Sequence, residues 1–395
     1  MTPEEVELLS QLTIVIPTYN RPLALERSIE YWRDLPVTVH ILDGSEKPWF
    51  PVGNLDGIPN IFYHYFAPKN GESKWQGLRS RLEIAVTLPK TKFSAMFGDD
   101  DFFLISGLCT ALKTLDQSDQ IYSVTGLTIG FECLGEKTRW GYREIETQSR
   151  HLFESEDVSD RLSTHRWGEV PITYYGLFKT EIWQKTFELS YRYDFPLVVS
   201  GERLVHAISL ALGPMKVIDD ALWLRRFWVD RLNLEVPEGG RASFEKFLSD
   251  PINQEVVQKY FNLLIEAIQD GTPQLSVKQA SELAKNTFVP GVRTSQVGAR
   301  KWLRLKTAKF LSRIGVVVPS SLRVTLNRKF AGSVTRSLGF REIDEDLKPG
   351  LGRHSLSDFL KVFSKTNPIE VTHEITEIDR LLLKPREELR LRANI

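Results

Sequence analysis

Apolar and polar positions along the first part of the chain predict strands that alternate with helices. Residues 12–17 and 37–42 are apolar on both faces and rich in β-branched side chains, as in the buried strands of a parallel sheet. Between them, Leu25, Ile29 and Trp32 recur at the spacing of one helix face. A strand, a helix and a second strand in this order predict a right-handed crossover unit, so the chain begins as an α/β protein.

The same alternation continues to about residue 230 and then changes. Further strands are predicted at 61–66, 93–97, 120–130, 216–218 and 221–227, a strand and turn at 171–178, and helices at 73–88, 108–115, 180–189 and 202–212. The polar segment 132–160 is expected to be a loop or a small hairpin over the site. Strand patterns then stop and helical patterns follow, so we expect a boundary near residue 235. The predicted fold class is α/β, with a mixed, mostly parallel sheet flanked by helices in 1–235 and a mainly α-helical region in 236–395.

Composition excludes several classes of function. The chain has 395 residues, of which 42% are hydrophobic, enough for two or three domains with a substantial core. Lysine plus arginine and aspartate plus glutamate each total 51, so the net charge of zero gives no argument for a nucleic-acid partner. Two cysteines, Cys109 and Cys133, argue against a disulfide framework or a cysteine zinc site. The first residues lack the basic region of a signal peptide and no apolar run approaches the roughly 20 residues of a spanning helix, so we predict a cytoplasmic protein.

One stretch departs from this balance of charge. Residues 293–341 contain twelve lysines or arginines and no acidic residue. A helix over 301–314 places Leu303 and Phe310 on one side and basic residues such as Lys306 on another, which predicts peripheral membrane contact at the inner face of a membrane. The alternative is a helix that packs on the catalytic domain and leaves its basic face in solvent.

Three adjacent aspartates, Asp99, Asp100 and Asp101 (the acidic triplet), follow the apolar run 93–97. Adjacent carboxylates repel one another, so a fold that fixes them at the mouth of a buried strand usually offsets them with a cation. A hard divalent cation such as Mg²⁺ or Mn²⁺ takes one or two carboxylates together with phosphate oxygens and waters. The triplet therefore predicts metal-assisted chemistry; the alternative is an acidic turn that caps the helix expected near Ser106.

The unusual polar residues all follow predicted strand ends, and that edge of an open α/β sheet binds ligands. The order of Ile14-Val-Ile-Pro-Thr-Tyr-Asn-Arg21, Ile41-Leu-Asp-Gly-Ser45, the acidic triplet and a helix started by Glu202 resembles the family 2 glycosyltransferases. The resemblance covers about residues 10–230. It implies the GT-A fold, a Rossmann-like sheet that binds a nucleoside diphosphate sugar, and dependence on a divalent metal.

The nucleotide contacts are expected in the turns after the first two strands. Tyr19 is placed to stack on a base and Asp43 to accept a hydrogen bond from a base N–H; the two positions match the family's uridine-contacting tyrosine and aspartate, which implies a UDP-sugar. Leu42 stands where many members have a second acid, which leaves one carboxylate at that contact. The alternatives are a half-buried turn aromatic and a turn aspartate that binds its own backbone. The same turn and the triplet supply further candidate donor contacts: Pro17, Asn20, Arg21 and Asp99.

Several cations are candidates to pair with the diphosphate of the donor. They are Lys74, Arg79, Arg225 and Arg226. Which aspartate of the triplet holds the metal stays open. Alignment by Ile105 and Leu108, where the family often has proline and leucine, selects Asp100, whereas a literal reading of the D-x-D pattern selects Asp99 and Asp101.

Glu202 is the predicted general base. In inverting members of the family an aspartate, often preceded by glutamate, holds this place at the same distance from a glycine, here Gly213. Glu202 replaces that aspartate and Gly201 the preceding acid, and glutamate at a first helical turn also has a purely structural explanation in the helix dipole. His206, one turn later, is expected to be structural rather than part of the acceptor pocket.

The sequence thus predicts an inverting glycosyltransferase that uses Mn²⁺ or Mg²⁺ and acts on a saccharide or glycolipid acceptor. The resemblance and the basic stretch suggest a role in bacterial surface polysaccharide or glycolipid assembly. Two alternatives remain. One is a nucleotidyltransferase of related fold, although Pro17 to Pro22 has no glycine for a phosphate-binding loop. The other is a binding scaffold without turnover.

Overall fold

The computed structural model describes residues 1–49, 55, 57–71, 74–134, 137–143, 150–164, 172–195, 198–226, 247–288, 355–364, 369–385 and 389. Its centre is a nine-stranded sheet of order β3-β2-β1-β4-β8-β6-β9-β5, with β7 paired to β6 off this path. The strands are β1 (Leu12–Thr18), β2 (Thr38–Asp43), β3 (Ile61–Tyr65), β4 (Phe93–Met96), β5 (Phe102–Phe103), β6 (Ser123–Leu134), β7 (Lys137–Arg143), β8 (Leu177–Lys179) and β9 (Met215–Arg226).

The sheet is mixed, and most strands in it run in one direction. β1, β2, β3 and β4 are mutually parallel, and β8 runs antiparallel to β4. β6 is antiparallel to β8 and parallel to β9, so both long strands follow the direction of β1. β5 and β7 run the other way. This confirms the predicted fold class of a mixed, mostly parallel sheet flanked by helices.

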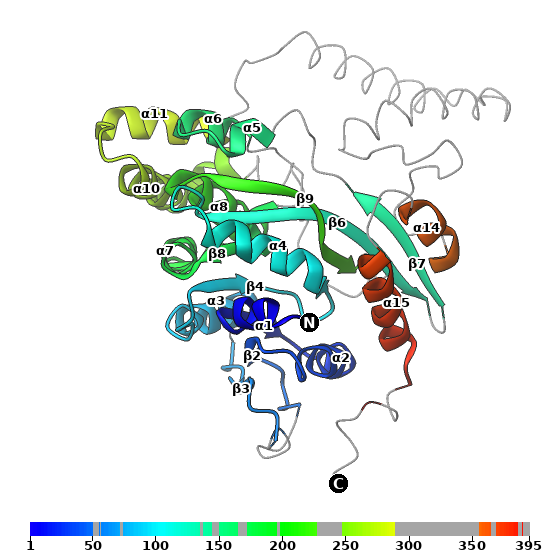
Figure 1. Cartoon of the computed structure of the whole chain (residues 1–395). Coiled ribbons are helices and arrows are strands. Elements are labelled where there is room, and N and C mark those ends of the chain that lie inside the picture. The colour runs from blue at the N-terminus through cyan, green and yellow to red at the C-terminus, as the bar shows by residue number, and fades with distance from the viewer. Residues whose placement is uncertain are drawn as a thin grey trace, which may run out of the picture.

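Helices cover both faces of the sheet and continue beyond it (Figure 1). They are α1 (Pro3–Ser10), α2 (Pro22–Trp32), α3 (Lys74–Ala85), α4 (Ile105–Asp116), α5 (Arg150–Phe153), α6 (Val158–Ser163), α7 (Thr180–Tyr191), α8 (Val198–Leu212), α10 (Gln254–Gly271), α11 (Val277–Phe288), α14 (Leu356–Phe363) and α15 (Ile369–Leu383), with 3₁₀ turns η2 (Ile172–Tyr175) and η4 (Pro251–Asn253).

Alternation along β1 divides its side chains between two cores. Ile14 and Ile16 join a cluster with α1, α2 and α4, whereas Val15 joins a cluster with α3, α7 and α8. Successive strand side chains point to opposite faces, so an all-apolar strand needs a helix layer on each side. The hydrophobic run at 12–17 therefore becomes the centre of a three-layer arrangement.

The structure corrects several predicted elements. The first helix α1 was not predicted; Thr2 accepts the Glu5 backbone N–H and Glu5 accepts that of Thr2, a capping box that starts it. α8 begins at Val198, so Glu202 lies inside the helix and does not start it. The last two predicted strands form one strand, β9, with an irregular register against β6 near Thr125. The polar segment after residue 132 contains the β6–β7 hairpin, one of the two forms expected for it.

All described elements after residue 236 are helical, as expected, and they join cores that contain N-terminal strands. α10 and α11 pack with α8 and the first half of β9, and α14 and α15 with β5, β6, β7 and the second half of β9. The two helix pairs thus lie at opposite ends of the long strands (Figure 1). The predicted basic helix at 301–314 lies outside the described residues. Within the described part of the chain, no helix is both long and apolar enough to cross a membrane.

Candidate active site

The carboxyl ends of β1, β2 and β4 meet at one edge of the sheet. Thr18, the last residue of β1, pairs with Asp43, the last of β2, and the Phe97 N–H that follows β4 donates to the Val15 carbonyl. Because these strands are parallel, the turns that follow them lie side by side. The turn after β1, the turn at Asp43 and the acidic triplet therefore come together, as the sequence predicted.

Asp99 is held by the turn after β1. Its carboxylate accepts hydrogen bonds from the Thr18 hydroxyl (2.7 Å) and from Arg21 Nη1 (2.7 Å), and the residue is 3% exposed. Burial and the neighbouring Asp100 carboxylate raise the pKa of Asp99, while Arg21 opposes the rise. Both carboxylate oxygens of Asp99 therefore already accept hydrogen bonds from within the protein.

Asp101 is held by strand β9, through the pairing of β9 with β5. Phe102 and Phe103, the two residues of β5, pair with Leu224 and Trp223 of β9. This pairing lets the Asp101 carboxylate accept hydrogen bonds from Trp223 Nε1 (3.1 Å) and from the Arg226 backbone N–H (2.8 Å). Burial, followed by the charge of the neighbouring carboxylate, raises the pKa of Asp101.

Asp100 is the member of the triplet with an oxygen to spare. Its Oδ2 atom is buried and receives no hydrogen bond from the described residues, although Arg21 Nη1 and Arg226 Nη1 lie 3.2 Å and 3.8 Å away. The guanidinium groups thus already supply part of the positive charge that the sequence argument assigned to a metal. One open carboxylate fits a Mg²⁺ or Mn²⁺ ion that takes its other ligands from phosphate and water. It does not fit an all-protein cage: no group of three or more histidine, cysteine or acidic ligands occurs in the described chain.

Glu202 shares this site through two aromatic residues. Trp223, which donates a hydrogen bond to Asp101, packs against Tyr175, the last residue of η2, with the ring centroids 4.5 Å apart and the ring planes tilted by 36°. After burial, the charge of Glu202 is the largest cause that raises the pKa of the Tyr175 hydroxyl, and Asp101 also contributes. The charges of the predicted base and of the triplet therefore both act on the Tyr175 hydroxyl.

Burial is the main influence on the pKa of the Glu202 carboxyl. It raises the pKa above the ordinary glutamate value, and Arg225 and Arg203 oppose the rise. Arg225 lies against the Trp223 ring, 5.1 Å from its centroid. A carboxylate with a raised pKa is a stronger base for a hydroxyl proton than an exposed one, provided that it stays ionised at the working pH.

His206, one turn beyond Glu202, has the structural role expected for it. It is 5% exposed, and its Nδ1 lies 3.0 Å from the Thr173 hydroxyl of η2. Burial, with the charge of Arg203, lowers the pKa of His206 to about 3, so the ring is neutral at physiological pH. This contact joins α8, which carries Glu202, to η2, which carries Tyr175.

Asp43 is bonded by its own loop. The side chain is fully buried; Oδ1 accepts the Ser45 N–H (2.8 Å), and Oδ2 accepts the Trp49 N–H (3.2 Å) and the Tyr63 hydroxyl. This is the turn arrangement that was the alternative to a base contact. A nucleotide contact through Asp43 stays a prediction, and it requires one of these donors to share the carboxylate.

Asn20 ties the first two turns together. Its φ of 53° lies in the left-handed region, which asparagine tolerates better than most residues. Its N–H donates to Ser45 Oγ (2.7 Å), and its side-chain oxygen accepts the Glu46 N–H (3.1 Å). Pro17, still within β1, is half-buried beside it. The backbone on both sides of Tyr19, in β1 and at Asn20, is thereby fixed.

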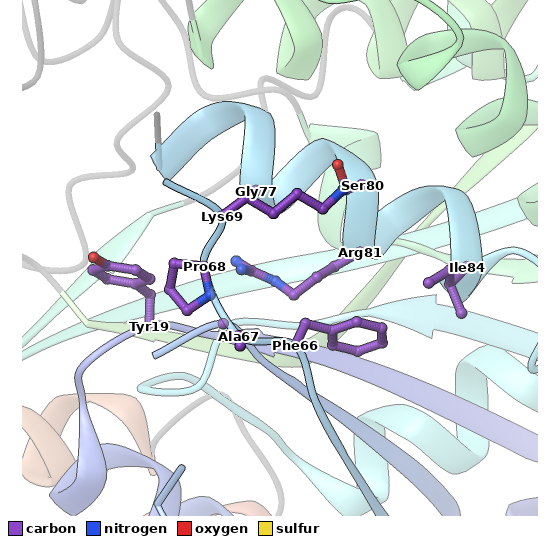
Figure 2. Close-up of a pocket in the computed structure, with 10 residues that line it drawn as sticks. Tyr19, Phe66, Ala67, Pro68, Lys69, Gly77, Ser80, Arg81 and Ile84 are labelled. Atoms are coloured by element: carbon purple, nitrogen blue, oxygen red, sulfur yellow. The ribbon is translucent and has the colours of Figure 1, made fainter. Parts of the chain in front are cut away.

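Tyr19 lines a cavity of about 360 Å³ between the first two turns and α3. Figure 2 shows the Arg81 side chain extending from α3 toward Pro68 and Tyr19. Arg81 is 5% exposed, and its guanidinium lies on Gly44: a Cβ built there would be 1.5 Å from Nη1. An aromatic ring, a proline and a cation thus face one concave space at the strand edge, an arrangement suited to a planar, anionic ligand.

Two other predicted cations have different positions. Arg79 donates to the carbonyls of Tyr191 (2.9 Å) and Arg192 (3.2 Å) and pairs with Glu83, so its guanidinium joins α3 to the end of α7. The structure does not bring it to the triplet. Lys74 is the first residue of α3, and its side chain lies outside what the structure describes. Arg226 reaches the triplet, where it pairs with Asp100, and Arg225 lies against the ring of Trp223, which donates to Asp101.

Sequence reasoning missed Thr18, Arg81, Tyr175 and Trp223 as site residues. For Arg81 a signal was available, because it lies on the same predicted helix as Arg79, two positions further. Positions two apart on a helix differ by about 200° around its axis, so only one of the two arginines faces the sheet edge. Tyr175 and Trp223 gave no such signal, because their place depends on the β5–β9 pairing.

No protein-family model and no curated protein sequence matches this chain. Among similar solved structures is S. aureus TarS 1-349, with 16% identity and a TM-score of 0.37 over 73% of this chain and 91% of that chain. A second structure of S. aureus TarS has 14% identity and a TM-score of 0.36, and the match covers 70% of this chain and 54% of that chain. A mannosyltransferase from Pyrobaculum calidifontis in complex with GDP-Man and Mn²⁺ has 14% identity and a TM-score of 0.34, covering 83% and 87%. These values are too low to assign a residue role or a substrate.

Proposed function

We propose that this chain is an inverting glycosyltransferase of the family 2 type, which transfers a sugar from a nucleoside diphosphate sugar to an acceptor hydroxyl. One observation carries the proposal. The charges of Glu202 and of the acidic triplet both act on Tyr175, whose ring packs against Trp223, the residue that donates to Asp101, and a cavity with an aromatic ring and a cation lies at the same strand edge. Base, leaving-group site and nucleotide site are the three parts that this reaction needs.

The chemistry follows from these positions. Glu202 takes the proton of the acceptor hydroxyl, and the hydroxyl oxygen forms a bond to the anomeric carbon of the donor sugar. The bond between that carbon and the diphosphate oxygen breaks, and its electron pair leaves with the diphosphate. Direct displacement inverts the configuration at the anomeric carbon. The raised pKa of Glu202 matches the role of a proton acceptor.

The leaving diphosphate is proposed to lie between Asp100 and the arginines around it. Arg21 and Arg226 pair with Asp100 in the protein alone, and phosphate oxygens offer them a stronger bidentate partner. Asp100 would then hold Mn²⁺ or Mg²⁺, which neutralises charge on the diphosphate when bound. The base and ribose would occupy the cavity beside Tyr19 and Arg81. A UDP-sugar is the proposed donor.

The proposal is tested first by the melting temperature of the full chain with nucleotides. We expect UDP with Mn²⁺ to raise it, because a ligand that binds only the native state stabilises by about 2.7 kcal/mol at a hundred times its Kd. UDP with a chelator, and GDP or ADP with Mn²⁺, are the controls. If no nucleotide raised the melting temperature in the presence of metal, the proposal would be contradicted. If GDP raised the melting temperature and UDP did not, the proposed nucleobase would be corrected from uracil to guanine.

A second test addresses the nucleotide cavity. Gly44→Ala is expected to weaken UDP binding by about tenfold to a hundredfold, because the new Cβ displaces the Arg81 guanidinium and a hydrogen bond to a charged group stabilises by about 1.5–3 kcal/mol. Titration calorimetry of UDP with Mn²⁺ measures the change. Arg81→Met, which leaves Gly44 intact, should give a similar loss. Wild-type affinity in both variants would exclude this cavity as the nucleotide site.

The predicted cellular setting is a separate proposal. A role in surface polysaccharide or glycolipid assembly at the inner face of a membrane rests on the basic stretch 293–341, which lies outside the described residues. Charge reversal of Lys306, Lys309 and Arg313 is expected to reduce binding to anionic liposomes. Unchanged binding would remove the membrane contact from the proposal and leave the transferase activity standing.

A further inference from the structure

Helix α4 begins directly after the acidic triplet and β5, and it has no N-terminal cap of its own. Its N-cap residue, Leu104, makes no side-chain hydrogen bond. The first backbone N–H groups of a helix have no partner within it, and leaving them unsatisfied in a buried place is costly. Another part of the chain must therefore supply an acceptor.

Glu374 of α15 supplies it from 269 positions away. Its Oε2 accepts the Ile105 N–H (2.6 Å), and its Oε1 accepts the Ser106 N–H (3.1 Å). A carboxylate at this place also complements the positive end of the helix dipole. Both oxygens of one side chain thus fix the first turn of α4, four residues after Asp101.

Three further polar contacts, made by two side chains, hold α15 in register. Asp379 accepts hydrogen bonds from the Thr138 hydroxyl and from Trp140 Nε1 (2.9 Å) of β7. Lys384, just after the helix, pairs with Glu30 of α2 (3.4 Å). α15 is therefore fixed at the same time to the hairpin, to α2 and to α4.

An apolar core that includes Phe102, the residue after the triplet, reinforces these contacts. Ile375 and Ile378 of α15 are buried in one cluster with Phe102 of β5 and Leu224 of β9. Phe102 and Leu224 are the pair that aligns β5 with β9 and so brings Asp101 to Trp223 and Arg226. α15 thus packs on the paired strands β5 and β9, which orient Asp101, and it also caps α4, the helix that follows the triplet.

We infer that α15 is a positioning element of the acidic triplet and that Glu374 is the residue through which it acts. The role of Glu374 in turnover rests on the proposed function, whereas its role in holding the segment 99–106 does not. A helix of the C-terminal region, outside the predicted catalytic domain, would then be required for an ordered metal and diphosphate site. Loss of the cap is expected to loosen the turn at Asp100 without removing any ligand.

The test is Glu374→Gln in the full chain, which keeps the shape of the side chain but turns one acceptor into a donor that faces an N–H group. Amide hydrogen exchange of a peptide that covers residues 99–106 is expected to become about tenfold faster, while exchange in α8 stays unchanged. Glu377→Gln is the matched control: it lies on the same helix, and its carboxylate pairs with the exposed Arg380. Exchange at 99–106 equal to that of the wild type would overturn the inference.

A second readout links the position of the triplet to the site. Titration of Mn²⁺ in the presence of saturating UDP is expected to give about tenfold weaker binding in Glu374→Gln and no change in Glu377→Gln. A lower melting temperature with unchanged Mn²⁺ affinity would show that Glu374 is merely structural and would overturn the positioning role. If wild-type protein binds no Mn²⁺ with UDP, the proposed function fails, and the exchange measurement still decides whether α15 holds the triplet.

Discussion

Glu202→Gln is expected to lower the rate of sugar transfer by about 10²–10⁴-fold, the usual contribution of a positioned general base. The amide has nearly the same shape but does not accept the hydroxyl proton. Glu202 does not line the cavity beside Tyr19 and Arg81, which is the proposed nucleotide site. UDP affinity should therefore stay within about twofold of the wild type. Single-turnover transfer and calorimetry measure the two quantities separately.

The pH dependence of the wild type is part of the same expectation. A base must be deprotonated to act, and burial raises the pKa of Glu202 above its ordinary value. The rate should therefore rise with pH through an apparent pKa above that of an ordinary glutamate and fall on acidification below it. Glu181→Gln, at an exposed site in the first turn of α7, is the control and should keep both the rate and this profile. A Glu202→Gln variant that binds UDP and turns over like the wild type would refute the assignment of the base.

Asp100→Asn is expected to weaken Mn²⁺ binding in the presence of UDP by about a hundredfold or more and to lower turnover in parallel. Its Oδ2 is the buried oxygen of the triplet that receives no hydrogen bond from the described residues, so it is the atom available to a metal. An amide oxygen carries no charge and is a poorer ligand for a hard cation. Titration of turnover with Mn²⁺ and calorimetry with UDP give the two values.

The neighbouring aspartates provide the sharpest comparison. Asp99→Asn and Asp101→Asn remove carboxylates that are bonded to Thr18 and Trp223, so they are expected to lower the melting temperature more than they lower Mn²⁺ affinity. Asp116→Asn at the exposed end of α4 controls for the loss of one surface charge. A larger loss of Mn²⁺ affinity in Asp99→Asn or Asp101→Asn than in Asp100→Asn would show that another aspartate holds the metal.

Much of the fold was predictable because its signals are local. β1, β2 and β4 are short apolar runs that end in polar turns, and each appears within a residue or two of the predicted bounds. Parallel strands bring their carboxyl ends to one edge, so the meeting of Asp43 and the triplet followed from the order of elements alone. The bounds of α8 were less secure: helical pattern extends upstream of Glu202, and the expected start at that residue was wrong.

The sequence by itself determined the alternation of strands and helices, the edge at which the polar residues gather and the carboxylates available there. Tertiary structure decided which of these carboxylates accept hydrogen bonds from the chain. The β5–β9 pairing supplies donors to Asp101 and the turn after β1 supplies donors to Asp99, whereas Asp100 Oδ2 accepts no hydrogen bond from the described residues and is held only by its ion pairs with Arg21 and Arg226. Glu374 caps α4 across 269 positions, a contact that no local pattern encodes. Hydrophobic periodicity records which face of an element is buried, but hydrogen-bond partners depend on which distant elements that face meets.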